Sequence, residues 1–485
     1  MIAEFTFGPW LPDGIDFKNP GLEDALNVIP SPEGYQPALG PDTASADVGS
    51  TVLSAAMFER SDGTRVTVCA TAGDLHTVIN GTVTDSSLSL SLTDPVAFER
   101  YGSSIYATSK SGVWYLDDIE ADNTFAAESW TIPHGAVIGR VNDFLFMGDL
   151  TDTDSSDAPF RIRWSPFNDP QGEWETSIAT QSDAVDMPEG YGPVTGIGPG
   201  TYGVIFQKNA ISRISYTGGT AVFAKVIVDR ERGCIAPRSI VTVGDRHYFL
   251  AHDGFFYTDG GPAQPISRGR VWRWFLENSQ ATYSSAVSGA VNWPDRCILW
   301  SIQGDSGAPI GLLCFNWETE NWSHIDLTFD AIFASGRDGV SLEDVAATYS
   351  NIDTMPVSLD SPEFAARGRS VGVFVGGEMS QLAGSSLGAM FETAEWQPAP
   401  GKRSFVREIS PLITNASEDT TVKVGGRVRS NDTISFSSDV SLGPAGFAPV
   451  NFDARYLRAQ FRIPAGTNWT DAYGFQADYS VSGAT

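Results

Sequence analysis

Residues 239–267 read SIVTVGDRHYFLAHDGFFYTDGGPAQPIS, and this stretch indicates the fold class. Three short runs of β-branched and aromatic residues are separated by turn residues at Gly244-Asp245 and at Asp253-Gly254. A third cluster, Asp259-Gly260-Gly261, closes the last run. Short apolar runs divided by Asp-Gly and Gly-Gly turns are typical of consecutive antiparallel hairpins. One such meander cannot bury both of its faces, so it needs similar units on either side.

Similar units recur along the chain. A turn followed by a short apolar strand is found at six places: Gly63 (VTVCA), Gly102 (SIYAT), Asn142 (FLFMG), Gly203 (VIFQK), Gly244 (YFLA) and Asp295 (CILWS). A period near 40 residues with several strands per unit is typical of β-propeller blades. The longest interval contains TDTDSSDAP (151–159), which we interpret as an inserted loop. A face-to-face β-sandwich is the alternative, although it would not readily use six similar units in succession.

The sequence therefore predicts an all-β protein in three parts. Residues 1–50 are rich in proline and predict an extended N-terminal arm with one short helix at Gly21–Val28. Residues 51–387 predict a propeller-like domain of roughly six blades, with room for a seventh. Residues 388–485 predict a separate C-terminal β-sandwich, because Tyr456–Ile463 alternates apolar and polar side chains. We expect the apolar residues of the arm to pack on this sandwich.

Composition limits the classes of partner. The chain has 485 residues, with 31 Lys and Arg against 59 Asp and Glu, which gives a net charge of −28. Such a surface should repel nucleic acid and anionic membranes. No apolar run approaches the roughly 20 residues that a membrane helix needs, so we expect no membrane span. The N-terminal residues MIAEFTFGPW lack the basic and apolar regions of a secretory signal.

The cysteines and histidines do not suggest a metal site. Cys69, Cys234, Cys297 and Cys314 form no CxxC pair, and we interpret them as buried reduced thiols. Cys297 and Cys314 could face each other across one hairpin, and they are the one pairing that merits a test. The five histidines show no ligand spacing. Asp152, Asp154 and Asp157 could offer carboxylates to calcium, but they lack the spaced Gly and the terminal Glu of a dedicated loop.

Two motifs resemble parts of enzymes. Gly304–Pro309 reads GDSGAP, which resembles the nucleophile loop of chymotrypsin-like proteases, with Ser306 as the serine. That family also needs a histidine in an Ala-Ala-His-Cys-like turn, and neither His76 nor His134 lies in one, so a hairpin loop is favoured. Gly198–Gly203 matches GxGxxG, but it opens a strand, so we interpret it as a turn between blades.

The remaining candidates are also interpreted as structural. Gly269–Glu277 (GRVWRWFLE) predicts a short amphipathic helix. A cluster of arginines and tryptophans there could bind nucleic acid, but packing of the tryptophans with solvated arginines is favoured: Arg268, Arg270, Arg273, Trp272 and Trp274. No pair of carboxylates is distinguished as a glycosidase pair. We therefore predict no catalytic, cofactor-binding or metal-binding residue, and no enzyme activity.

Four stretches resemble one protein family. Residues 160–174 read FRIRWSPFNDPQGEW, and residues 233–266 read GCIAPRSIVTVGDRHYFLAHDGFFYTDGGPAQPI, followed by the RVWRWFL helix. The opening stretch 11–37 reads LPDGIDFKNPGLEDALNVIPSPEGYQP, and 454–466 reads ARYLRAQFRIPAG. Together they are similar to the tail nozzle, or packaged-DNA stabilisation, proteins of short-tailed bacteriophages. The resemblance is patchy, but it includes both ends and the middle of the chain.

The resemblance implies a structural virion protein. It implies a ring, with six copies expected, at the distal end of a phage tail assembled in the host cytoplasm. Expected partners are further copies of the chain, a tail adaptor or hub protein above it, tail fibre or spike proteins, and double-stranded DNA that passes without specific binding. An acidic conduit would retain packaged DNA and not adhere to it. The alternative is a soluble β-propeller enzyme or glycan-binding protein with a site at the central channel.

Overall fold

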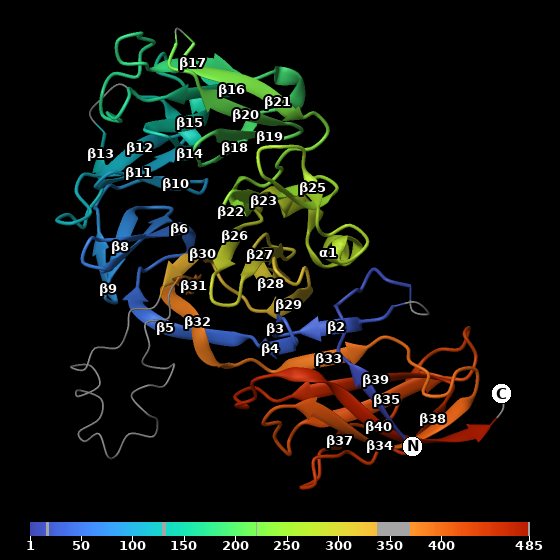
Figure 1. The fold of residues 1–485 in the computed structure, drawn as a ribbon. Helices are drawn as coiled ribbons and strands as arrows, with labels where there is room; N and C mark the ends of the chain where they lie inside the picture. The colour runs from blue at the N-terminus through green and yellow to red at the C-terminus, as the bar shows by residue number, and fades with distance from the viewer. Residues whose placement is uncertain (16–18, 129–131, 220, 337–368, 484–485) are drawn as a thin grey trace, which may run out of the picture.

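The computed structural model describes residues 1–15, 19–128, 132–219, 221–336 and 369–483. It confirms an all-β fold with a propeller-like domain. Figure 1 shows a ring of small sheets beside two larger sheets that contain both chain termini. In the described residues there is one α-helix, α1 (Trp272–Asn278), with short 3-10 turns that include η3 (Pro237–Ser239) and η4 (Ala281–Ala286). No helix in this part of the chain has the length and apolar character needed to cross a membrane.

Within the described ranges, seven four-stranded antiparallel units follow one another, and we call them blades one to seven. Blade one comprises β6 (Val52–Glu59), β7 (Arg65–Thr71), β8 (Leu75–Ile79) and β9 (Thr82–Asp85). Blade two comprises β10 (Ala97–Tyr101), β11 (Ser104–Ser109), β12 (Gly112–Leu116) and β13 (Ala126–Ala127). Blade three comprises β14 (His134–Val141), β15 (Phe144–Thr151), β16 (Asp157–Trp164) and β17 (Asp183–Asp186). Blade four comprises β18 (Val194–Gly198), β19 (Gly203–Gln207), β20 (Ile211–Tyr216) and β21 (Phe223–Asp229). Blade five comprises β22 (Val241–Val243), β23 (Arg246–Ala251), β24 (Gly254–Thr258) and β25 (Gln264–Pro265). Blade six comprises β26 (Gly289–Asn292), β27 (Cys297–Gln303), β28 (Pro309–Asn316) and β29 (Trp322–Asp326). Blade seven comprises β30 (Ala331–Gly336), β31 (Arg369–Val375), β32 (Glu378–Ser386) and β5 (Leu39–Asp47).

The recurring apolar run recognised in the sequence is the second strand of a blade. The six runs correspond to β7, β11, β15, β19, β23 and β27. These strands pair on both edges and lie between neighbouring blades, so nearly all their side chains are buried. Continuous apolar runs are expected for strands covered on both faces. The second strand of blade seven, β31, did not fit the period because it follows the long segment 337–368.

The N-terminal segment closes the ring. β5 pairs with β32 and is the outermost strand of blade seven, while β30 of that blade lies against β6 of blade one. The prediction of an extended arm over residues 1–50 that packs on the C-terminal sandwich is therefore wrong for residues 39–47, which form a propeller strand. Pro41 is tolerated here because β5 is an edge strand, where one side of the backbone needs no ladder partner.

The two larger sheets, which we call the platform, are built from both ends of the chain. In the first, β2 (Leu22–Leu26) pairs with β29 of blade six on one side and with β33 (Ala389–Thr393) on the other. That sheet continues through β39 (Tyr456–Ile463), β35 (Thr421–Arg427), β36 (Ser435–Phe436) and β37 (Val440–Ser441). The second contains β1 (Ile2–Thr6), β3 (Val28–Ser31), β4 (Gly34–Pro37), β40 (Ala472–Gly483), β34 (Arg403–Ile413) and β38 (Phe452–Ala454).

This arrangement corrects two expectations. Gly21–Val28 is not helical: Leu22–Leu26 is a strand, and the chain turns at Asn27, which has a φ of 57°. The C-terminal sheets are also not separate, because β2 makes one of them continuous with blade six. A helix would leave β29 and β33 with unpaired edges, whereas a strand satisfies both.

Aromatic side chains from both ends of the chain fill the platform core. Phe7 stacks on Phe391 at 4.7 Å between ring centroids, and Phe5 stacks on Phe475 at 5.1 Å. The predicted apolar face of β39 is confirmed, since these side chains are buried: Leu457, Ala459, Phe461 and Ile463. One continuous cluster of buried apolar residues joins this core to blades five and six. The expectation that the N-terminal segment packs on the C-terminal sheets is confirmed.

Two loop assignments differ from the sequence interpretation. The stretch 151–159 is a hairpin between β15 and β16, and not an insertion. The extra length lies in 165–182, where Trp174 is buried in the core. Gly198–Gly203 connects the first two strands of blade four, so it is a hairpin turn within a blade and not a turn between blades.

Replacing Phe391 should destabilise the platform, because its ring is buried against Phe7, Tyr35 and Trp469. We expect Phe391→Ala to reduce the free energy of unfolding by about 3–5 kcal/mol, measured by urea unfolding. Phe436→Ala is the matched control, because Phe436 is exposed on β36. Equal effects of the two substitutions would contradict this description of the core.

Candidate functional site

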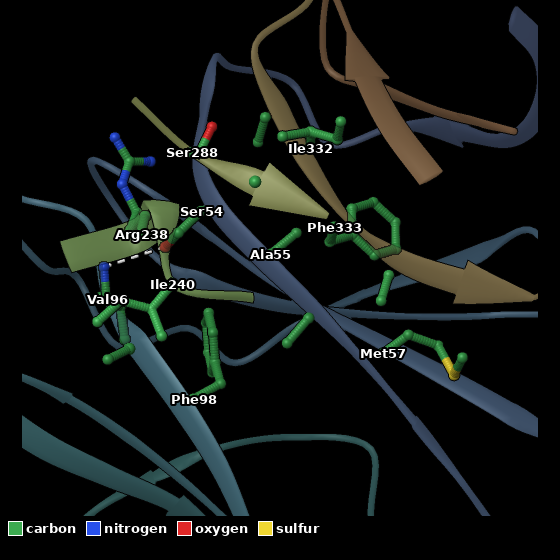
Figure 2. Close-up of a pocket in the computed structure, with 15 residues that line it drawn as sticks. Ser54, Ala55, Met57, Val96, Phe98, Arg238, Ile240, Ser288, Ile332 and Phe333 are labelled. Atoms are coloured by element: carbon green, nitrogen blue, oxygen red, sulfur yellow. Dashed lines mark hydrogen bonds between the residues drawn. The ribbon is translucent and has the colours of Figure 1, made fainter. Parts of the chain in front are cut away.

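The propeller axis contains two adjoining cavities. The first strand of each blade pairs only with the second, so its other edge is left unpaired in the described sheets. A cavity of about 340 Å³ lies among blades one, two, five, six and seven. A second, of about 610 Å³, lies toward blades three and four. Val96, Ala97, Arg238 and Ile240 line both. Figure 2 shows the smaller cavity, with Arg238 on one side and Phe333 and Met57 on the other.

Arg238 holds three blades together. It extends from η3, just before blade five, and its guanidinium donates to the Leu53 carbonyl at 2.9 Å and to the Ala286 carbonyl at 3.1 Å. These carbonyls belong to blade one and to the segment that enters blade six. Burial lowers the pKa of the Arg238 guanidinium, which nevertheless stays charged.

A lysine lies at the wall of the larger cavity between two carboxylates. The Lys110 ammonium is 2.9 Å from the Asp149 carboxylate and 2.5 Å from that of Asp157. Burial opposes the charge on Lys110, but hydrogen bonds to both carboxylates raise the pKa of its ammonium overall. The charge of the Lys110 ammonium is therefore balanced by two carboxylates, whereas the Arg238 guanidinium donates to neutral carbonyls.

A carboxyl group lies between the first strands of blades two and three. Glu99 is half-buried on β10, and burial raises the pKa of its carboxyl from 4.5 to about 7. The Arg100 amide, which donates to it at 3.2 Å, and the nearby Arg140 guanidinium offset only part of that effect. Glu99 is thus the inner-strand group that titrates near neutral pH.

The three carboxylates considered for calcium are used by other partners. Asp152, whose side chain is 2% exposed, is bracketed by Arg161 at 2.9 Å and Arg163 at 3.2 Å. Asp154 accepts from Ser156, and Asp157 pairs with Lys110. In the described part of the chain, no group of three His, Cys, Asp or Glu side chains is placed to hold a metal ion.

Ser306 lies exposed in the hairpin loop between β27 and β28, where its hydroxyl accepts from the Ala308 amide at 3.4 Å. Each of the five histidines contacts a different partner: His76 with Asp85 and Thr71, His134 with Glu128, His247 with Thr242, His252 with Asp253, and His324 with Asp24. Burial lowers the pKa of His247 to about 4. The contacts of the described residues therefore favour the hairpin-loop interpretation of this motif.

All four cysteines are free and buried, as the sequence indicated. Cys297 pairs with Asn316, and Cys314 pairs with Leu299, so the two thiols lie diagonally across the hairpin. Burial and the adjacent Cys314 thiol raise the pKa of Cys297, which makes its thiolate unfavourable.

The predicted basic-aromatic helix joins the propeller to the N-terminal segment. The Asp13 carboxylate accepts from the Arg273 amide at 2.8 Å and from the Trp274 amide at 2.9 Å, at the first turn of α1. Trp274 packs on Trp10 and on His324, with ring centroids 4.8 and 4.7 Å away. The interpretation of the tryptophans as packing residues is confirmed.

Sequence reasoning did not identify the residues that the tertiary structure brings together here. Nothing in the local sequence distinguishes Arg238 or Glu99. Arg238 lies just before blade five, Glu99 lies on a strand, and Asp13 lies in the Pro-rich N-terminal segment. Asp13-Gly14 is a turn signal, which could have suggested a capping residue for a neighbouring helix. For Arg238 there is no such signal, because its carbonyl partners lie 185 and 48 residues away along the chain.

No protein-family model matches the chain, and no curated protein matches it either. Solved structures similar to it include the extracellular domain of the hybrid two component system BT4673 from B. thetaiotaomicron, at 10% identity and a TM-score of 0.42, covering 86% of this chain. The chain spans about half of that protein, 47%. Virginiamycin B lyase from Staphylococcus aureus has 10% identity and a TM-score of 0.41, with 71% of this chain and 98% of the lyase covered. YCF48 bound to D1 peptide has 11% identity and a TM-score of 0.38, with 73% and 97% covered.

Substituting Asp152 should destabilise blade three, because it would leave the buried Arg163 guanidinium without its carboxylate. We expect Asp152→Asn to reduce the free energy of unfolding by about 3–5 kcal/mol in chemical denaturation. Asp154→Asn, at an exposed position, should have little effect, and added calcium should not raise the unfolding temperature. A calcium-dependent increase that Asp154→Asn abolishes would show that the loop binds the ion.

Glu99 should make stability depend on pH between about 4.5 and 7. In that range the unfolded chain has lost the proton that the folded chain retains, so the free energy of unfolding falls as the pH rises. Glu99→Gln should therefore match the unsubstituted chain at pH 4 and be more stable by about 1–2 kcal/mol at pH 8, after allowance for partial exposure.

Thermal unfolding across this pH range would measure the difference. Glu33→Gln, at an exposed turn, is the control and should change little. A Glu99→Gln variant that loses stability at pH 8 would show that the carboxylate is stabilising, contrary to this account.

Proposed function

We propose that this chain is a subunit of a ring-shaped nozzle at the distal end of a short phage tail. In this role it is a structural virion protein that retains packaged DNA and allows it to leave through an acidic channel. The ring is formed by copies of the chain, six on the resemblance, docked to an adaptor or hub protein of the tail. Tail fibre or spike proteins attach to the same assembly.

The observation that carries the proposal is that two of the four family-like stretches, one from each end of the chain, meet in the platform. Residues 11–37 supply β2, β3 and β4, and 454–466 include β39. β33 lies between β2 and β39 in one sheet. The RVWRWFL stretch forms most of α1, which Asp13 caps from the opening stretch. The resemblance therefore includes the place where the two ends of the chain are joined, as well as parts of blades three and five, and this supports a shared architecture.

The charge distribution also supports a conduit. A channel that binds phosphates through free Lys and Arg side chains would retain DNA by counterion release. Two of the three arginines of the α1 region have carboxylates close by: Arg270 contacts Glu320 at 3.3 Å, and Arg273 contacts Glu277 at 3.8 Å. With a net charge of −28 on each copy, a ring would repel DNA along most of its surface.

The platform exposes apolar side chains that a second copy could cover. At the start of β1, which pairs with β40, Ile2 is 72% exposed and the preceding Met1 is 66% exposed. Adjacent exposed apolar groups are typical of contact surfaces. A head-to-tail contact through this surface would generate a closed ring if its rotation closes.

The test is to measure the mass of the full chain in solution and to image tails assembled with it by electron microscopy. We expect a closed ring that contains the chain at the distal tip. An Ile2→Glu variant should lose the ring, because charge on the contact surface must be desolvated. Ile178→Glu, at an 80% exposed position in blade three, is the control and should assemble normally. The proposal fails if neither the solution species nor the tails contain a ring of this chain.

A further inference from the structure

The charge of Arg238 is matched by neutral partners only. In the described residues its hydrogen bonds go to two main-chain carbonyls, and no ion pair of Arg238 is found there. It is the one ionisable side chain among those that line the smaller axial cavity. A half-buried guanidinium at a cavity wall is stabilised by a carboxylate or another anion, which forms charge-assisted hydrogen bonds with it. The cavity thus presents a single positive charge in a chain that is otherwise strongly acidic.

The rest of the cavity wall offers hydrogen bonds and small apolar surfaces. The first strands β6, β26 and β30 line it, and each has one edge outside its own ladder. Such an edge presents main-chain N–H and C=O groups. The side chains between them are small. Ser54 and Ser288 also line the cavity, where the Ser54 hydroxyl accepts from the Val96 amide at 3.0 Å and the Ser288 hydroxyl donates to that of Ser301 at 3.4 Å (Figure 2). These groups suit a ligand with several hydroxyls, which can both donate and accept.

Apolar side chains complete the wall opposite the charge. Phe333 and Met57 lie on the far side of the cavity from Arg238 (Figure 2). Ile240 lines both cavities. A volume of about 340 Å³ is within the range of sites for small molecules. A ring with one apolar face and several hydroxyls fits such a wall, and the guanidinium matches the planar, bidentate geometry of one carboxylate.

We propose that the axial cavity binds a small hydroxylated monocarboxylate, a sugar acid of the uronic type. The carboxylate accepts from the Arg238 guanidinium, and the hydroxyls pair with the free strand edges of blades one, six and seven. This site is independent of the nozzle role, because it lies inside each propeller and not at the platform.

Titration calorimetry on the full chain tests the site with three probes. We expect sodium glucuronate to bind with one site per chain. Glucose, which lacks the carboxylate, and inorganic phosphate, which lacks the hydroxyls, should each bind at least tenfold more weakly. Equal binding of phosphate and glucuronate, or no glucuronate binding at millimolar concentration, would overturn the proposal.

Two variants test the assigned wall. Arg238→Gln should weaken glucuronate binding tenfold or more by removing the charge. Ala97→Met should weaken it by filling the space where the two cavities meet, while leaving Arg238 in place. Arg268→Gln is the control, because Arg268 is exposed and outside both cavities. If Arg238→Gln does not fold, the Ala97→Met result decides, and unchanged binding in that folded variant would place the ligand elsewhere.

Discussion

The pairing of β2 on both of its edges is the constraint on which the rest of the structure depends. Leu26 of β2 pairs with His324 of β29 in blade six, and Leu22–Leu26 pair with β33 of the platform. The propeller and the platform therefore share one sheet and one apolar core. A joint made of main-chain hydrogen bonds and buried aromatic rings resists hinge motion better than a linker would.

The same N-terminal segment also supplies the strand that completes the last propeller blade. A circular array of blades has a last blade that must be completed and joined to the first. Here β5 completes blade seven, and β30 meets β6. In the described sheets of the closed ring, the unpaired inner edges of the first strands lie at the axis, where they are hidden from other chains, while the outermost strands of blades one to five each keep one unpaired edge at the periphery. The hidden inner edges cannot pair with another chain, and they surround an axial cavity with Arg238 in its wall.

Acidic residues have two different roles in this chain. Some satisfy particular cations, as Asp152 does for Arg161 and Arg163, and Asp13 satisfies the amides of α1. Many others are exposed and give the surface its charge. Because exposed carboxylates contribute little to folding free energy, their number relates to solubility and to repulsion of DNA more than to the fold. The buried ones are therefore those whose removal affects stability most.

The sequence by itself determined the strand content, the blade period and the core face of β39. These features follow from local patterns, because a strand covered on both faces must be apolar throughout and a half-covered strand must alternate. It also indicated α1, expected over Gly269–Glu277 and found over Trp272–Asn278. The seventh blade, the strand at Leu22–Leu26 and the environment of Arg238 were decided only by the tertiary structure. LEDALNV is compatible with a helix in isolation, and it becomes a strand because β29 and β33 offer two unpaired edges to it. Likewise, Arg238 is a candidate ligand-binding residue only in the folded ring. There the carbonyls of Leu53 and Ala286 hold its guanidinium by hydrogen bonds.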